Sequence, residues 1–135
     1  MSYKIEEIEG IGSEYAEKLR EVDIQTTDDL LRRCGDKKGR EGVSKETGIS
    51  EKRILDWVNR SDLMRINGVG EEYSDLLEEA GVDTVKELAT RNAENLAQAM
   101  EEKNASRKLV DRTPSAEVVQ KWIDEAKGME PMVSH

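Results

Sequence analysis

The same short glycine pattern occurs at two places in the chain, and this repetition constrains the fold more than any other feature. The two copies, 58 residues apart, read Ile8-Glu9-Gly10-Ile11-Gly12 and Ile66-Asn67-Gly68-Val69-Gly70. Glycine adopts a positive φ without a Cβ clash, so each pattern predicts a tight turn. A helix is expected to follow each turn, and its first backbone N–H groups point outward at the positive end of the helix dipole. Such a turn can bind a phosphate, or it can simply join two helices.

The repetition extends well beyond the glycine turns. At the same offset, the matching pairs include Tyr15 with Tyr73, Leu19 with Leu77, Thr26 with Thr84, and Arg33 with Arg91. Farther along, Trp57 matches Trp122 at an offset of 65, so the second copy contains seven extra residues. We interpret the chain as a tandem duplication, with copies over residues 1–60 and 61–128 and a flexible tail over residues 129–135.

Apolar residues in both copies follow the helical period. Tyr15, Leu19 and Val22 recur with the spacing of one helix face, and the second copy repeats this stripe from Tyr73 onward. No segment shows the alternation of apolar and polar residues that is typical of a β-strand. We therefore predict an all-α fold built as a compact bundle of short helices.

Capping residues indicate where the helices begin and end. Expected starts are Thr26 or Thr27, Ser50, Thr84, Asn92 and Ser115, and expected ends are Gly48, Gly81 and Gly128. Two polar stretches are expected outside the helices. The first begins at Cys34 and lasts until a helix starts near Arg40, and the second runs from Lys103 to Arg112.

On its two glycine turns, the chain resembles the helix-hairpin-helix superfamily. Residues 80–88 are also similar to the matching segment of the C-terminal domain of the bacterial RNA polymerase α-subunit, a member of that superfamily. The whole arrangement, over residues 5–127, most resembles the domain-of-unknown-function family 4332. This resemblance implies a bundle of short helices with hairpin turns at Gly10, Ile11, Gly12, Gly68, Val69 and Gly70.

In many helix-hairpin-helix relatives, the hairpin amides contact DNA phosphates without reading the base sequence. The DNA-binding members commonly place Lys or Arg directly after the turn, whereas this chain has Glu14 in the first copy and Glu71 and Glu72 in the second. A carboxylate there interacts with the helix dipole itself and repels an incoming phosphate. We therefore favour a structural role for the glycine turns over phosphate binding.

The charge balance narrows the classes of partner. A net charge of −9 opposes generic binding to nucleic acids or to anionic membrane surfaces, because both attract a basic protein. The sequence contains no run of membrane-spanning length and no signal peptide, so we expect a cytoplasmic protein. A single cysteine, Cys34, excludes a disulfide framework and a cysteine-based zinc site.

Basic residues are concentrated in two segments, in contrast to the net negative charge of the chain. They are candidate contacts for an anion or a nucleic acid, and they comprise Arg32, Arg33, Lys37, Lys38, Arg40, Lys103, Arg107, Lys108 and Arg112. The alternative, which we favour, is that they neutralise acidic faces of the protein itself. The paired glutamates, such as those at 78–79 and 101–102, are interpreted as solvated helix faces.

Three classes of function remain: a protein-binding adaptor, a binder of nucleic-acid backbones and an enzyme, of which the enzyme is the least favoured. Trp57 and Trp122 lie in apolar stripes and are expected in the core. The only histidine is His135, near the end, so no catalytic constellation or metal site can be assembled. We predict a non-catalytic adaptor without a cofactor that binds another protein. The alternative is non-sequence-specific binding to a nucleic-acid backbone through the two turns and the basic segments.

Overall fold

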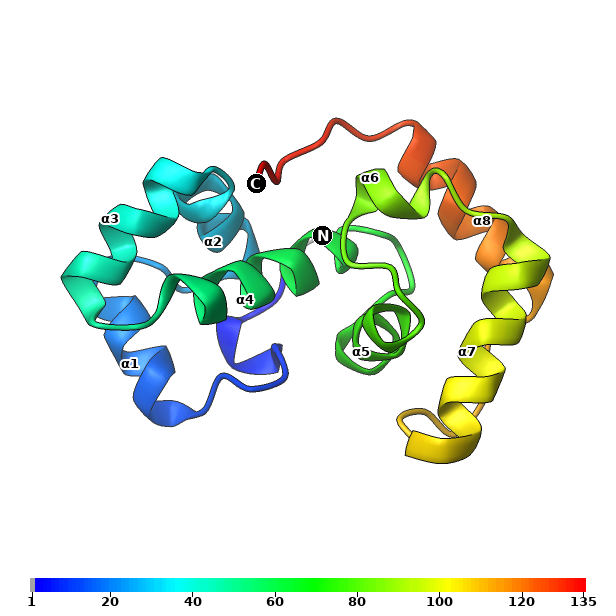
Figure 1. Cartoon of the computed structure of the whole chain (residues 1–135). Coiled ribbons are helices and arrows are strands. Elements are labelled where there is room, and N and C mark those ends of the chain that lie inside the picture. Colours follow the sequence, from blue (N-terminus) through cyan, green and yellow to red (C-terminus); the bar gives the residue numbers. More distant parts are fainter. Residues whose placement is uncertain (1) are drawn as a thin grey trace.

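The computed structural model describes residues 2–135, and these residues form a compact bundle of short helices (Figure 1). The elements are a 3₁₀ helix η1 (Ile5–Glu7) and the α-helices α1 (Ser13–Glu21), α2 (Thr27–Cys34), α3 (Lys37–Thr47), α4 (Glu51–Leu63), α5 (Glu71–Glu79), α6 (Val85–Leu88), α7 (Ala93–Arg107) and α8 (Ala116–Lys127). Over this range no strand forms, and one isolated bridge joins Lys4 to Thr26. The predicted all-α class is therefore confirmed.

Side-chain caps begin six of the α-helices. Each accepts a hydrogen bond from the backbone amide three residues later, and the caps are Thr26, Asp36, Ser50, Thr84, Asn92 and Ser115. Asp36 explains the first departure from the sequence prediction. Its carboxylate accepts from the Gly39 amide at 2.7 Å, so α3 begins at Lys37 and not near Arg40.

The second polar stretch also differs from the prediction. Its first five residues, from Lys103 onward, continue α7 as far as Arg107. Lys108 then ends the helix in the left-handed conformation, with φ of 51°. The amide side chain of Asn104 stabilises this end, because it accepts from and donates to the backbone of Val110. The loop between α7 and α8 therefore covers residues 108–115, of which 108–112 belong to the expected stretch.

Two clusters of buried apolar residues form the core. The first lies among η1 and α1–α4, and the second among the end of α4 and α5–α8. Leu63 and Met64 are consecutive, yet they pack into different clusters, so α4 connects the two halves of the molecule (Figure 1). Trp57 is 2% exposed and Trp122 is 5% exposed, which confirms their predicted places in the core.

The two glycine turns have matching geometry. Gly10 adopts φ of +92° and Gly68 adopts φ of +91°, which confirms the prediction of a positive φ in each turn. The residue between the two glycines of each turn, Ile11 or Val69, points into the core. Each turn then leads directly into a helix, α1 or α5, whose first residue follows the second glycine.

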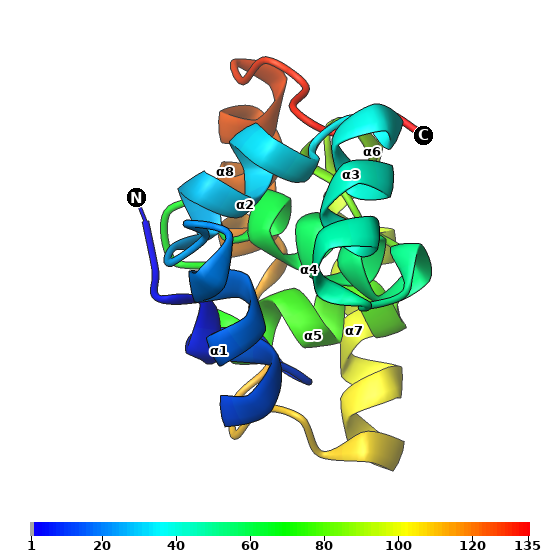
Figure 2. The ribbon, with the colours of Figure 1, turned by 90° about the vertical axis from the view of Figure 1, so that its left-hand side faces the viewer.

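Residues 129–135 contain no helix and cross from the end of α8 back to α2 and α3 (Figure 1, Figure 2). The sequence predicts a flexible tail here, whereas the structure gives this segment defined contacts with the first half. The Ser134 amide donates to the Gly35 carbonyl at 2.9 Å, and Val133 packs against the first core cluster. Among residues 2–135, no helix is both long and apolar enough to span a bilayer.

Candidate functional site

The helices that follow the glycine turns begin differently from the others. Within the described chain, α1 and α5 are the only α-helices without a side-chain cap, because their N-cap residues are Gly12 and Gly70. The first backbone N–H groups of these two helices therefore have no capping side chain. Acidic residues lie in the first turn of both, Glu14 in α1 and Glu71 with Glu72 in α5.

The fold brings the first glycine turn against the start of α5. Glu9 of that turn lines one cleft together with Glu71, Glu72, Asp75, Lys108 and Leu109, and the cleft has a volume of about 270 Å³. We call it the acidic cleft. Four carboxyl groups and one amine line the cleft, and Arg60 pairs with only one of the four, Asp75, so an excess of negative charge remains at the three glutamates.

Crowding of like charges in the acidic cleft is seen at Glu71. Partial burial raises the pKa of this carboxyl above its usual range, and a hydrogen bond with Glu9 and the charges of Glu9, Glu72 and Glu7 raise it further. These neighbours come from both halves of the molecule. A cation placed in the cleft would relieve this repulsion, so the cleft is suited to a positively charged group.

Behind the cleft, one arginine holds α4 against α5. Arg60 donates to Asp75 at 2.7 Å, and its Nε atom lies 3.3 Å from Glu78 and 3.5 Å from Asp56. Burial raises the pKa of Glu78 to about 8, and a hydrogen bond with Asp56 adds to this effect. Asp75 belongs to both groups, so it links the acidic cleft to the packing between the halves.

Four of the nine basic candidates, all of them arginines, are engaged by the protein itself. Arg40 is 4% exposed and donates to the carbonyl oxygens of Cys34, Gly35 and Ser134. It is therefore unavailable to an external anion, which removes it from the candidate contacts, and its partners are backbone oxygens and not an acidic face. Arg33 donates to the Val22 carbonyl at 2.7 Å.

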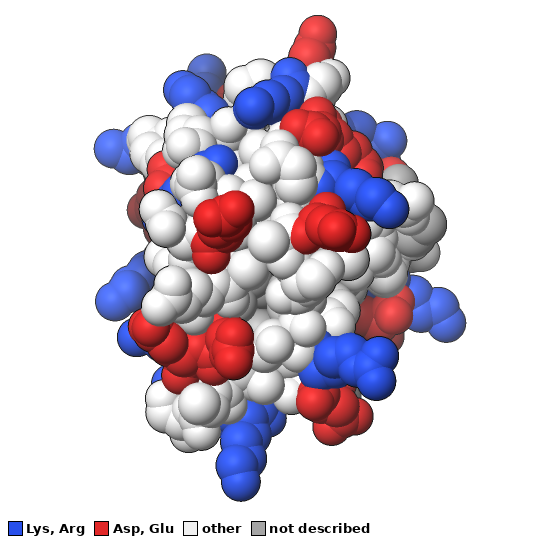
Figure 3. All heavy atoms as spheres, turned by 90° about the vertical axis from the view of Figure 1, so that its right-hand side faces the viewer, with Lys and Arg blue, Asp and Glu red and all other residues white. Residues whose placement is uncertain are grey.

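Two other arginines of the basic segments have acidic partners within the protein. Arg32 pairs with Asp29, and Arg107 lies 3.2 Å from Glu79. The remaining members of the set are exposed, and they are Lys37, Lys38, Lys103, Lys108 and Arg112. The face that carries α7 and α8 shows acidic and basic side chains dispersed among neutral ones, without a continuous basic patch (Figure 3).

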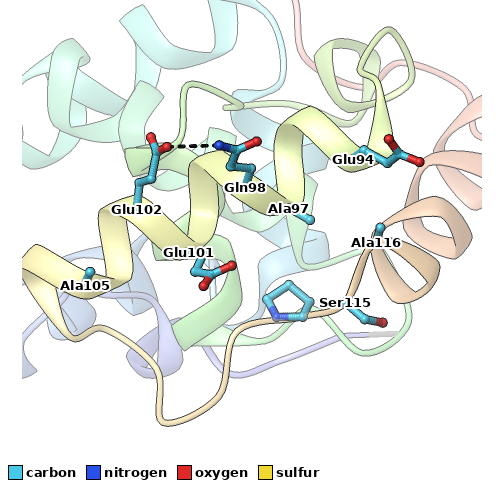
Figure 4. Close-up of a pocket in the computed structure, with 9 residues that line it drawn as sticks. Glu94, Ala97, Gln98, Glu101, Glu102, Ala105, Ser115 and Ala116 are labelled. Atoms are coloured by element: carbon cyan, nitrogen blue, oxygen red, sulfur yellow. Dashed lines mark hydrogen bonds between the residues drawn. The ribbon is translucent and has the colours of Figure 1, made fainter.

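A larger hollow lies between α7 and the start of α8 (Figure 4). Its lining includes small residues such as Ala97 and Ala116 and the carboxylates of Glu94, Glu101 and Glu102, with no lysine or arginine. It therefore favours positive charge as well, but none of the residues that the sequence analysis proposed for binding lies in it.

Sequence reasoning located the glycine turns but missed the acidic cleft. Glu9 and Glu71 are 62 positions apart, and only the packing of the first turn on α5 brings them together. The described residues include no group of three or more His, Cys, Asp or Glu side chains arranged to hold a metal ion. Cys34 is buried, and this burial raises the pKa of its thiol to about 11.

Comparison with known proteins gives one match. A family model described as a domain of unknown function, DUF4332, matches residues 9–129. No curated protein and no solved structure matches the chain.

Proposed function

The chain belongs to the DUF4332 family, whose description assigns no activity, and we propose that it is a non-catalytic adaptor that binds a basic segment of another protein. The acidic cleft is the observation that carries this proposal. Its four carboxyl groups come from both halves, and Lys108 is the single cation that lines it. A Lys- or Arg-rich segment of a partner would supply the missing positive charge and would be steered by the net charge of −9.

The proposal includes a tandem duplication of a helix-hairpin-helix unit, in which the turns serve as scaffold. Matching φ angles at Gly10 and Gly68 support this, as do the matching ring pairs Tyr15–Trp57 and Tyr73–Trp122, whose centroids lie 5.2 Å and 5.4 Å apart. The similarity to the RNA polymerase α-subunit domain belongs to the same proposal. We also propose a cytoplasmic location.

One observation favours the alternative, binding to a nucleic-acid backbone. The uncapped starts of α1 and α5 leave backbone amides free to donate to phosphates. The carboxylates of Glu14, Glu71 and Glu72 oppose this, because they place negative charge in the same helical turns. The adaptor is therefore ranked first.

Fluorescence anisotropy with a labelled Lys- and Arg-rich peptide tests the adaptor. The informative variant is Glu9→Gln with Glu72→Gln, which removes two charges from the cleft. The matched control is Glu101→Gln with Glu102→Gln, which changes the net charge equally but lies in the hollow of α7. We expect the cleft variant to weaken binding by about tenfold, equivalent to about 1.4 kcal/mol, and the control to change it much less.

Equal weakening by both variants would reject the cleft as the specific site, because overall charge or the hollow at α7 would then account for the binding. A pull-down from the native host, with and without nuclease, separates the two classes of partner. The adaptor predicts protein partners that remain after nuclease treatment. Partners that disappear with nuclease would favour the nucleic-acid alternative.

A further inference from the structure

Each half contains a second kind of pocket, in which a tryptophan edge meets the glycine turn. The pocket of the first half has a volume of about 450 Å³ and is lined by Gly10, Ser50, Lys52, Arg53, Asp56 and Trp57. That of the second half has a volume of about 430 Å³, and its lining includes Gly68, Tyr73, Arg112, Ser115 and Trp122. We call them the indole pockets. They share no lining residue with the acidic cleft.

An unpaired donor lies in each indole pocket. The Nε1 atom of Trp57 lies 3.6 Å from the position that a Cβ on Gly10 would occupy, and Trp122 Nε1 lies 3.5 Å from that position on Gly68. Both glycines are exposed, whereas both tryptophans are at least nine-tenths buried. Within residues 2–135 neither indole N–H has a hydrogen-bond acceptor, and neither is sealed from solvent.

The absence of a side chain on the glycine keeps each donor accessible. A Cβ at Gly10 or Gly68 would be in van der Waals contact with the indole nitrogen. An N–H group that reaches solvent and has no acceptor within the protein is satisfied by water or by a ligand. The same open donor in both halves can therefore bind an acceptor that comes from outside the chain.

Each indole pocket also contains an arginine, but the two arginines do not occupy corresponding positions in the two halves. In the first pocket Arg53 lies over the Tyr15 ring, with its guanidinium carbon 5.4 Å from the ring centroid. The residue at the corresponding position in the second half is Val118, which cannot supply a charge. There Arg112 lines the pocket instead.

The placement of Arg112 follows from the seven extra residues of the second copy. The Tyr73 hydroxyl donates to the Arg112 carbonyl at 2.9 Å and so anchors this loop beside Trp122. The one carboxylate in either pocket is Asp56, and it is 3.5 Å from Arg60. Both pockets thus combine an indole N–H, a serine at a helix start and an arginine.

We propose that the two indole pockets are subsites for carboxylate side chains of an acidic peptide segment on a protein partner. A carboxylate can accept from the indole N–H and from the guanidinium at the same time, and such charge-assisted hydrogen bonds are strong. A polyphosphate backbone fits less well, because it carries a charge on every nucleotide and the net charge of −9 repels it more than a peptide whose carboxylates are spaced by neutral residues. The subsites are separate from the acidic cleft and do not depend on it.

Nuclear magnetic resonance offers a direct test, because the chain contains two tryptophans and therefore two indole N–H signals. Trp57→Phe and Trp122→Phe assign the signals. The probe is a short peptide of alternating Glu and Gly, and the control peptide has Gln in place of Glu. We expect both indole protons to move downfield and saturate with the Glu peptide, and to move little with the Gln peptide.

Two further variants test the arginines, with the other pocket as an internal control. Arg53→Gln should weaken the titration at Trp57 by about tenfold and leave that at Trp122 unchanged, and Arg112→Gln should do the reverse. The pair Glu9→Gln with Glu72→Gln should leave both titrations intact, which separates this proposal from that of the acidic cleft.

Three outcomes would overturn the proposal. Signals that do not move would show that the donors are satisfied by water alone. Equal shifts with the Gln peptide would show that the pockets do not distinguish a carboxylate from an amide. Larger, saturating shifts with duplex DNA or inorganic phosphate than with the Glu peptide would assign the pockets to phosphate groups.

Discussion

Arg40 donates a hydrogen bond of 2.7 Å from its Nη2 atom to the carbonyl oxygen of Ser134, a residue 94 positions later in the chain. The same guanidinium donates to the carbonyl oxygens of Cys34 and Gly35, so a buried positive charge is surrounded by backbone oxygens. The third of these oxygens, that of Ser134, comes from the final segment, residues 129–135. The two halves are therefore connected twice, by α4 and by residues 129–135.

Replacing Ser134 tests this second connection. Ser134→Pro removes the amide that donates to the Gly35 carbonyl, whereas Ser134→Ala keeps it. We expect Ser134→Pro to lower the free energy of unfolding by about 0.5–1.5 kcal/mol, the usual net value of one hydrogen bond, and Ser134→Ala to have little effect. Urea denaturation measures both. Identical stabilities would mean that the hydrogen bond from Ser134 to Gly35 contributes nothing to the stability of the fold.

The tryptophans are predicted to carry much of the stability of their halves. Trp57→Ala and Trp122→Ala should each lower the free energy of unfolding by ~3–5 kcal/mol, because each leaves a cavity in a buried cluster. Trp57→Phe and Trp122→Phe are the milder controls. Denaturation curves compare the four variants, and a loss below about 1 kcal/mol for both alanine variants would contradict the packing of the two clusters.

Stability should depend on the protonation of Glu78. Burial and Asp56 raise its pKa to about 8 in the folded protein, above the reference value of 4.5. The folded state then binds the proton more tightly than the unfolded chain, so this contribution is complete below pH 4.5 and is lost as the pH rises toward 8. Glu78→Gln should flatten the fall in stability over that range.

Urea denaturation at several pH values checks this dependence. The Glu78 carboxyl is surrounded by Asp56 and Arg60 on α4 and by Asp75 on α5. Glu79 is on the same helix but lacks these neighbours, so Glu79→Gln is the matched control. If Glu78→Gln and the unmodified protein lose stability in parallel between these pH values, then Glu78 is ionised throughout.

The nucleic-acid alternative is tested by reversing the charge beside the glycine turns. At physiological salt we expect the unmodified protein to bind duplex DNA no more tightly than ~10⁻⁴–10⁻⁶ M. Replacing Glu14, Glu71 and Glu72 with Lys should create salt-sensitive binding, because it replaces the negative charges in the first turns of α1 and α5 with positive ones.

Tight duplex binding by the unmodified protein would reverse our ranking. Its loss on Arg32→Glu, Arg33→Glu and Lys38→Glu would then identify the basic segment as the site. Arg40 is left out of this set because its guanidinium is buried and held by three carbonyl groups.

Local sequence determined the helices and the glycine turns. The capping side chains at Thr26, Ser50 and Ser115 act within three residues, and so they can be identified without knowledge of the fold. The positive φ values of Gly10 and Gly68 follow from the same short range, because the turn needs a residue without a Cβ. The apolar period likewise placed both tryptophans in the core.

Tertiary structure decided which charged groups meet. Glu9 and Glu71 form the acidic cleft, and Arg40 is buried by a segment that begins more than 80 residues later. Arg112 lines an indole pocket from the loop between α7 and α8, beside Val118. Such contacts depend on the relative placement of distant elements, which the periodicity of a single helix does not encode. The sequence therefore determined the scaffold, and the packing of its two halves decided its candidate binding sites.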